Sequence, residues 1–381
     1  MKKIAIARTN YLPLNTKTYN VQEIGLAVGL LEQNISTDIY SRFSDITETT
    51  MYYSNNGLEI RLIPLKGIIL FKRFTYFPKL INKLVNSRYD VVQVHENSQF
   101  MIPFIIGACN KAGVKSVLYQ GVYQNSSRVM RIYEFFFGAL FNKKMNSKLN
   151  LVLAKTKAAA KFLNSKGFSN IEVLPVGLNY NIEENNCLEY EQIVAFRKKF
   201  DKVLLYIGII EPRRNVDYLV EILSLLRFQK HKNIGLLLVG TGPDKDKINI
   251  YIKNHKLEDF ILCIEKIPNK ELKVVYQNSD IFLLASSYEI FGMVVLEALF
   301  YGLSVISTPT AGPQDILSSP DYGVCLDLNK DIWVEYILSV LATDCSAKKL
   351  NRTNYIKNNF NWNIIAKRYL ELMKKSKNCP Q

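Results

Sequence analysis

Apolar runs of strand length alternate with segments of helical length through both halves of the 381-residue chain. Between the first two runs, residues 21–32 carry apolar side chains at helical spacing. This alternation is typical of α/β units that build parallel sheets, so the sequence predicts two similar α/β halves. The segments predicted as strands are 4–7, 37–40, 91–94, 116–119, 151–154, 203–207, 236–239, 261–264, 281–285 and 305–307.

The length and one polar segment divide the chain. Domains commonly contain about 100 to 200 residues, which favours two here. Residues 179–190 are rich in Asn and Glu and poor in apolar side chains, as expected of a linker. We predict an N-terminal domain over residues 1–184 and a C-terminal domain over residues 185–381. Because ligands bind beyond the carboxyl ends of parallel strands, we expect a cleft between the two domains to hold the chemistry.

Composition excludes several protein classes. Hydrophobic residues make up 48% of the chain and charged residues 22%, which is an ordinary globular balance. No apolar run approaches the roughly 18 to 20 residues of a membrane-spanning helix. The apolar run before Arg8 is only four residues long, so we expect no secretory signal. The six cysteines are scattered without a C-x-x-C pair, which favours a reduced, cytoplasmic protein.

The positive charge is concentrated in one part of the chain. The formal net charge is +15, and residues 61–166 contain 18 basic and 3 acidic residues. Aromatic side chains lie among the basic ones in residues 71–77 and 131–144. This mixture suits peripheral docking on an anionic membrane, which we expect at the inner face of the cell membrane. A solvated basic face and a nucleic-acid-binding surface are the alternatives.

Two acidic residues bracket a predicted helix start in the second half. The strand 281–285 leads into a loop, and Phe291 and Gly292 then open a helix. Unpaired N–H groups at a helix start favour anions such as phosphate. Glu289 and Glu297, eight residues apart, suit hydroxyl pairs of a sugar, because carboxylates only accept hydrogen bonds. A ligand that carries hydroxyls on both sides of a phosphate would explain the whole pattern.

Other loops after strands offer cations and glycines. Arg213 and Arg214 follow the strand 203–207 and its Gly208, and arginine binds phosphate oxygens bidentately. A Gly-Thr-Gly-Pro loop, residues 240–243, follows the strand 236–239. Taken singly, such acids and arginines are more often solvated surface groups. Here they occur together in loops that follow strands and are expected to face the same cleft, which favours a binding site.

The linked motifs match a known family. Residues 208–217, 240–243 and 285–306 resemble, in order and spacing, the large retaining nucleotide-sugar glycosyltransferases of family-4 type. Glu289 to Glu297 is the E-x7-E element, and fainter similarity spans nearly the whole chain. The resemblance implies the GT-B fold, in which two Rossmann-like α/β domains face each other across a cleft. It also implies a C-terminal helix that returns to the N-terminal domain.

The resemblance assigns a role to each candidate residue. Glu289 would face the transferred sugar, Glu297 would hold the ribose, and Arg214 or Arg213 would hold the diphosphate. The family transfers sugar with retention and usually without a metal, so we expect no metal and no other cofactor. The further expected substrate contacts are Phe291, Gly292, Met293, Val294, Gly208, Gly242, Asn15 and Gln120.

Several positions depart from the family's pattern. Ile209 stands where an arginine is usual, and Arg214-Asn215 stands where a lysine-glycine pair is usual. Residues 13–16 replace a glycine pair, and Gln120 replaces a histidine. These changes affect the acceptor side and one phosphate contact, whereas the motifs of the donor side are retained.

The sequence thus predicts a retaining hexosyltransferase. We expect the donor to be a nucleotide diphosphate sugar, UDP-linked, and the acceptor to be a lipid-linked or other oligosaccharide in surface polysaccharide or lipopolysaccharide biosynthesis. A nucleotide-sugar epimerase or hydrolase of the same fold is the alternative enzyme. A basic nucleic-acid-binding protein is the alternative of another class, but it leaves the C-terminal motifs unexplained, so we expect no nucleic-acid partner.

Overall fold

The computed structural model describes residues 1–17, 20–55, 57–70, 74–124, 128–179, 191–230 and 232–376. The chain divides into two compact units. Unit 1 comprises residues 1–179 and 360–381, and unit 2 comprises residues 180–359. Residues 180–190 of the predicted linker, with the boundary at 184/185, lie outside the described residues, as do residues 71–73 of the basic segment.

Unit 1 is built on an eight-stranded sheet in the order β10-β9-β8-β7-β1-β2-β4-β3. All neighbouring strands are parallel except β3 and β4, which pair antiparallel. The short strands β5 (Ile68–Leu70) and β6 (Phe74–Tyr76) form a separate antiparallel pair. The sheet strands are β1 (Lys3–Ala7), β2 (Ser36–Ser41), β3 (Thr50–Asn55), β4 (Leu58–Pro64), β7 (Val91–His95), β8 (Lys115–Gln120), β9 (Leu151–Ala154) and β10 (Ile171–Val173).

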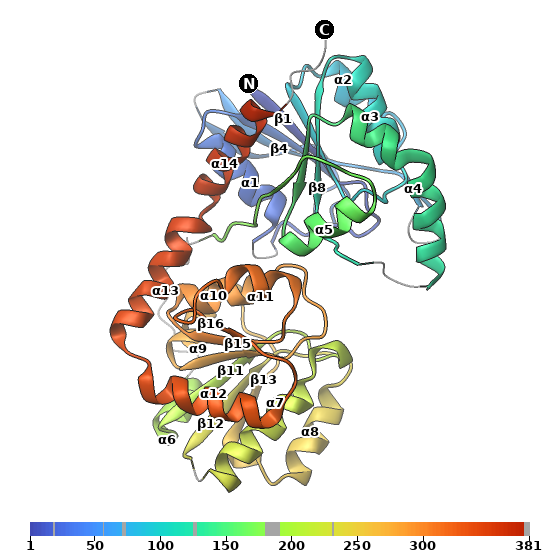
Figure 1. The fold of residues 1–381 in the computed structure, drawn as a ribbon. Coiled ribbons are helices and arrows are strands. Elements are labelled where there is room, and N and C mark those ends of the chain that lie inside the picture. The colour runs from blue at the N-terminus through green and yellow to red at the C-terminus, as the bar shows by residue number, and fades with distance from the viewer. Residues whose placement is uncertain are drawn as a thin grey trace. The chain divides into compact units, whose positions relative to one another are not determined.

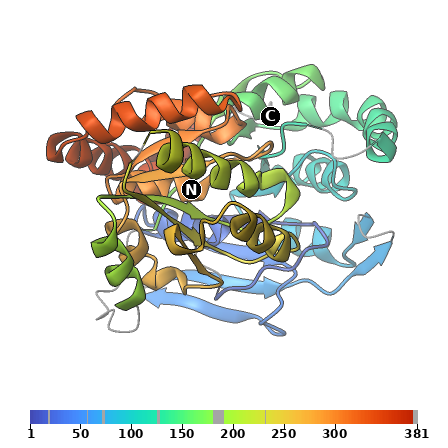
Figure 2. The same cartoon turned by 90° about the horizontal axis from the view of Figure 1, so that it is seen from below.

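Six helices accompany this sheet, and the long helix α4 lies at the outer edge of unit 1 in both views (Figure 1, Figure 2). The side chain of Thr156 caps α5 by accepting a hydrogen bond of 3.1 Å from the Ala159 amide. The helices are α1 (Gln22–Leu31), α2 (Leu80–Asn86), α3 (Ile102–Lys111), α4 (Arg128–Lys148), α5 (Lys157–Ser165) and α14 (Trp362–Lys375).

The last helix belongs to unit 1, as the resemblance implied. Helix α14, red in Figure 1, runs beside α1, which is blue. A Cβ atom on Gly25 would come within 2.2 Å of the Trp362 indole, and one on Gly29 within 2.3 Å of the Trp362 carbonyl oxygen. The indole N–H also donates to Asn20 Oδ1 at 3.2 Å. Two glycines one helical turn apart therefore make the groove in α1 that receives Trp362.

Unit 2 contains a six-stranded sheet, parallel throughout, in the order β13-β12-β11-β14-β15-β16. The strands β11, β12 and β14 are buried over nearly all of their residues, as expected for a parallel sheet covered on both faces. The strands are β11 (Lys202–Ile207), β12 (Ile234–Val239), β13 (Ile261–Ile264), β14 (Ile281–Leu284), β15 (Ser304–Ser307) and β16 (Gly323–Cys325).

The helices of unit 2 follow these strands in chain order. The main ones are α6 (Glu191–Lys199), α7 (Val216–Ser224), α8 (Lys245–Asn254), α9 (Lys273–Gln277), α10 (Met293–Phe300), α11 (Ala311–Ile316), α12 (Lys330–Thr343) and α13 (Ser346–Asn359). All ten predicted strands are present, and the predicted fold of two Rossmann-like α/β units is confirmed. None of the helices in the described ranges is long and apolar enough to span a bilayer.

Candidate active site

The candidate residues of unit 2 gather where the strand order of its sheet reverses. Strands β11 and β14 are neighbours, and the chain proceeds from them toward opposite edges of the sheet. The loops that leave such a pair of strands separate and form a crevice at their carboxyl ends. The loops after β11 and β14, residues 208–215 and 285–292, carry the predicted arginines and Glu289.

Arg214 and Glu289 form the central ion pair of this site. The distance between Arg214 Nη1 and Glu289 Oε2 is 2.5 Å, and the same Nη1 lies 3.0 Å from Ser286 Oγ. Both side chains are largely buried. Arg214 Nε is also buried, lies 3.8 Å from Glu211 and makes no hydrogen bond within the described part of the chain. A buried donor without a hydrogen bond is costly, so a ligand oxygen there would be favoured.

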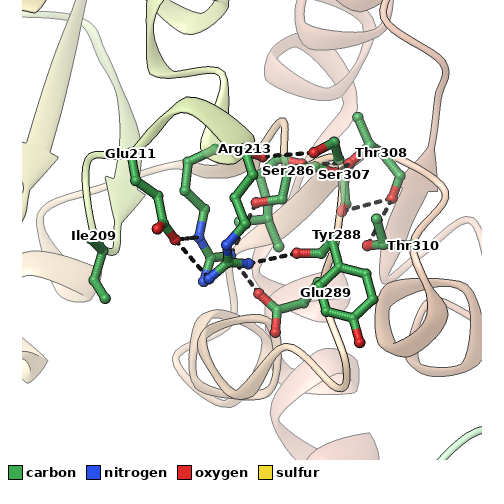
Figure 3. Close-up of polar contacts among 12 residues, drawn as sticks. Ile209, Glu211, Arg213, Ser286, Tyr288, Glu289, Ser307, Thr308 and Thr310 are labelled. Carbon is green, nitrogen blue, oxygen red and sulfur yellow. Dashed lines mark hydrogen bonds and ion pairs between the residues drawn. The ribbon is translucent and has the colours of Figure 1, made fainter. Parts of the chain in front are cut away.

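Arg213 and Asn215 bind the same loop from either side of Arg214. Arg213 Nη1 donates a 2.7 Å hydrogen bond to the Tyr288 carbonyl oxygen, and its Nη2 lies 2.7 Å from Glu211 Oε1. Asn215 Nδ2 donates to the Ala285 carbonyl oxygen at 2.8 Å. Figure 3 shows the acidic and carbonyl groups around the arginines. Residues 213–215 therefore hold the loop 285–289 in one shape.

Ile209 does not take part in this cluster. Its side chain lies apart from the arginines in Figure 3 and is 54% exposed. The family's usual arginine at this position therefore has no counterpart in Ile209. Arg213 is the cation next to Arg214. It forms an ion pair with Glu211 and donates a hydrogen bond to the Tyr288 carbonyl oxygen.

Gly292 sets the start of helix α10. Its φ of +81° lies in the left-handed region that glycine adopts without a steric penalty, and the helix begins at the next residue. A Cβ atom on Gly312 would lie 1.7 Å from the Phe291 carbonyl oxygen, so this backbone packs directly on the start of α11. The predicted helix start at residues 291 and 292 is thus within two residues of the observed one. The partial positive charge of the helix start lies three residues after Glu289 in sequence.

Glu297 is buried within α10 and is not a solvated helix acid. It is 6% exposed, and Tyr276 of α9 donates a hydrogen bond of 2.7 Å to its Oε2. Burial raises the pKa of Glu297 to about 7, against the lowering effect of the Tyr276 hydrogen bond. The Tyr276 ring stacks on Tyr301 with ring centroids 5.0 Å apart. Sequence reasoning missed Tyr276, because its link to Glu297 joins two different helices.

The glycines of the other loops have packing roles. A Cβ atom on Gly240 would lie 1.8 Å from the Gly208 carbonyl oxygen, and one on Gly242 would lie 2.2 Å from that of Ile210. The Gly-Thr-Gly-Pro loop therefore touches the backbone of the Gly208 loop. Substitution of Gly240 or Gly242 would push the two loops apart.

In unit 1, the two candidate residues have different environments. Asn15 is exposed, and its Oδ1 accepts a hydrogen bond of 2.9 Å from the Lys17 amide. Gln120 is buried, accepts from the Asn97 amide at 2.9 Å and donates to the Val122 carbonyl at 3.0 Å. The Gln120 amide thus ties together the loops after β7 and β8, and its contact with substrate stays a prediction.

A partly buried polar cluster, none of whose residues was among the predicted site residues, lies at the carboxyl ends of β7, β8 and β9. Glu96 has a φ of +62°, and its Oε1 accepts a hydrogen bond of 3.0 Å from the Gly121 amide. Lys155 Nζ donates to Gln22 Oε1 at 2.8 Å. Burial lowers the pKa of His95 to about 4, so this imidazole is neutral at physiological pH. The available signal was charged residues placed directly after apolar strands.

Within the described ranges, no group of three or more His, Cys, Asp or Glu side chains is arranged to hold a metal ion. Unit 2 also holds the Arg214–Glu289 pair in the loops after β11 and β14, the start of α10 directly after the second loop, and the buried Glu297 within α10. Such a set can bind an anion that carries hydroxyl groups.

Known proteins are similar to this chain in sequence and in fold. Residues 190–362 match the family described as glycosyl transferases group 1. The alpha-monoglucosyldiacylglycerol synthase of Acholeplasma laidlawii is 24% identical over 329 residues, covering 80% of this chain and 79% of that protein. The O-antigen chain mannosyltransferase B of Escherichia coli is 29% identical over 142 residues, 37% of each chain.

Among solved structures, HepE of Anabaena in complex with UDP has a TM-score of 0.73 to this chain at 14% identity, covering 98% of this chain and 100% of that one. This likeness concerns the fold, and the family match concerns the part of the chain that holds the Arg214–Glu289 pair and Glu297. Both agree with the family-4-type resemblance. The chain is therefore a glycosyltransferase with the GT-B fold, and its residues 190–362 match the model of the group 1 glycosyltransferases.

Proposed function

We propose that this protein transfers a hexose, with retention, from a UDP-linked nucleotide sugar to a lipid-linked saccharide acceptor in surface polysaccharide or lipopolysaccharide biosynthesis. We further propose that it works in the cytoplasm, peripherally at the inner face of the cell membrane. The observation that carries the donor assignment is the Arg214–Glu289 pair at the strand-order reversal, followed by the start of α10 and the buried Glu297.

In this proposal the donor lies across the carboxyl ends of β11 and β14. Arg214, or Arg213 beside it, and the first amides of α10 hold the diphosphate. Glu297 accepts hydrogen bonds from the ribose hydroxyls, and Glu289 faces the transferred sugar. Charge builds on the departing diphosphate as the glycosidic bond breaks, and losing one preorganised donor to such a group typically costs about 100- to 1000-fold in rate.

The names of similar proteins support the donor and acceptor classes. The Acholeplasma relative is named for a glucosyl lipid, the Escherichia coli relative for the O-antigen chain, and the Anabaena structure contains UDP. A lipid-linked saccharide acceptor would agree with the lipid in the first name and with the saccharide chain in the second. A UDP-linked donor is compatible with a site that offers arginines, amides and carboxylates in sequence along one edge of the sheet.

A screen of nucleotide sugars by thermal shift, followed by product analysis, tests the proposal. We expect UDP-sugars to raise the melting temperature, and we expect labelled hexose to appear in the lipid fraction only when a saccharide-lipid acceptor is added. Release of free sugar or of an epimer without acceptor would contradict transferase action. Stabilisation by GDP-sugars and not by UDP-sugars would contradict the proposed donor and leave the transfer reaction standing.

A further inference from the structure

Helix α4 of unit 1 presents bulky apolar side chains to solvent. Ile132, Phe135, Phe136 and Leu140 are 62%, 68%, 63% and 65% exposed. Their spacing places them along one side of the helix. We call these four residues the α4 face. Exposed apolar patches of this kind mark interaction surfaces, because a water-facing helix side is normally polar.

The other side of α4 already supplies the packing that the fold needs. Phe137 and Met145 are buried in the core of unit 1. The Phe137 ring lies 4.9 Å from that of Phe141, which in turn lies 5.8 Å from the ring of Phe104 on α3. The α4 face is therefore not needed to anchor the helix, and its four side chains are available to a partner.

Partly exposed aromatic side chains also lie on the neighbours of α4. Phe104 is 46% exposed, and Phe100, which precedes α3, packs against it with ring centroids 5.5 Å apart. Phe74 of β6 contacts both Phe100 and Tyr133, so the β5–β6 pair borders the same region. Helices α3 and α4 lie side by side in unit 1 (Figure 1). These aromatic side chains contact α4 through Phe141 and Tyr133.

The charges next to this patch are almost all positive. Arg131, Lys143 and Lys144 of α4 are exposed, and Glu134 is the one acidic residue in the sequence of that helix. The surrounding residues 61–166 carry the whole net charge excess of the protein. Cations that flank exposed aromatic and aliphatic side chains match the two layers of a bilayer surface, anionic headgroups above acyl chains.

We propose that the α4 face is the surface by which unit 1 docks on an anionic lipid bilayer. The apolar side chains enter the boundary between headgroups and acyl chains, while Arg131, Lys143 and Lys144 remain at the lipid phosphates. A second copy of the chain is disfavoured as the occupant, because two basic faces would oppose each other. Nucleic acid is disfavoured because Ile132 and Leu140 have no ring to stack on bases.

This inference deepens the proposed function, since a lipid-linked acceptor would be met at that surface. Its test does not depend on sugar transfer. The full-length protein is floated with vesicles of phosphatidylcholine alone and of phosphatidylcholine mixed with phosphatidylglycerol. We expect binding to the mixed vesicles at low salt, and we expect the triple variant Phe135→Ser/Phe136→Ser/Leu140→Ser to lower the partition coefficient about tenfold or more.

Two further variants make the test specific. The double variant Ile250→Ser/Leu350→Ser removes equally exposed apolar side chains from unit 2, at 62% and 61% exposure, and should bind vesicles as the wild type does. Lys143→Glu/Lys144→Glu should weaken binding to the anionic vesicles by about tenfold or more, and high salt should shrink the difference. This second variant keeps the α4 face intact, so it tests the proposal even where the triple variant fails to fold.

Three results would overturn the proposal. The wild type does not bind the mixed vesicles, or both α4 variants bind as well as the wild type, or sedimentation shows a dimer that the triple variant dissociates. Donor-induced thermal stabilisation is measured in parallel without vesicles. A variant that loses vesicle binding but still binds the donor reports on the α4 face alone. A wild-type protein that does not bind the donor would contradict the proposed function and leave the vesicle result to be judged by itself.

Discussion

Tyr276 and Glu297, which lie on different helices of unit 2, share a buried hydrogen bond of 2.7 Å from the phenol to the carboxylate. Burial of the carboxylate and this single phenolic donor act on its pKa in opposite directions. Tyr276 therefore influences both the orientation and the charge of the residue that we propose as the ribose ligand.

Removing that phenol should weaken donor binding. In Tyr276→Phe, Glu297 loses a hydrogen bond that favours its ionised form, so its pKa should rise and donor affinity at neutral pH should fall about tenfold. Isothermal titration with UDP-sugar measures this change. The matched control is Tyr301→Phe, because the Tyr301 hydroxyl makes no hydrogen bond in the described part of the chain. Equal affinities in the two variants would remove Tyr276 from the site.

Donor affinity should depend on pH through Glu297. With a pKa of about 7, the carboxylate ionises as pH rises through neutrality, and it then accepts hydrogen bonds from ribose hydroxyls more strongly. Affinity should increase across this range in the wild type and stay level in Glu297→Gln. Because the folded pKa lies above the ordinary value of 4.5, the apo protein should lose stability as pH rises from about 4.5 to just above 7, by on the order of 2 to 3 kcal/mol in total. A pH-independent wild type would refute both effects.

The two neighbouring arginines should differ in their contribution to turnover. Arg214→Ala removes the buried partner of Glu289 and the proposed diphosphate contact, so kcat should fall about 100- to 1000-fold. Arg213→Ala should cost less, because the Arg213 side chain is more exposed and its contacts are with Glu211 and a carbonyl. Lys245→Ala, which breaks a surface pair with Glu265, serves as the control. A larger loss for Arg213→Ala would exchange the two roles.

Glu289→Gln should affect turnover more than folding. The substitution keeps the shape of the side chain but removes the charge that faces Arg214 and, as proposed, the transferred sugar. We expect kcat to fall about 100-fold, while the free energy of unfolding changes by about 1 to 2 kcal/mol. Steady-state kinetics and thermal melting on the same preparation separate the two quantities. A drop in melting temperature that accounts for the lost activity would assign Glu289 a structural role.

Gly25→Ala should destabilise unit 1. The added methyl group would lie 2.2 Å from the Trp362 indole, so α1 and α14 would have to separate, at a cost of about 1 to 3 kcal/mol. Gly107→Ala is the matched control. Gly107 lies within α3, and an added Cβ would meet nothing nearer than Lys148 Nζ at 3.9 Å, so this variant should be neutral or slightly more stable. Chemical denaturation of both variants compares the two helical glycines directly.

Much of the architecture follows from local sequence patterns. The ten predicted strands occur where apolar runs end in turns, and α10 begins within two residues of its predicted start. Strands β3, β4, β10 and β16 and the β5–β6 pair were not predicted. The E-x7-E spacing predicts Glu289 and Glu297 as site residues, and the structure places the first in a loop and the second in the second turn of the following helix.

Side-chain partnerships could not be predicted in the same way. The groove formed by Gly25 and Gly29 receives Trp362 from the opposite end of the chain, and Tyr276 reaches Glu297 from a separate helix. Nor does helical spacing say which side of α4 faces water, because both sides of that helix are apolar. Hydrophobic periodicity and turn residues act between positions close in sequence, so the sequence by itself determines where the helices and strands form. Burial, ion pairing and exposure of a side chain depend on which helices and strands the fold brings together, so only the tertiary structure decides them.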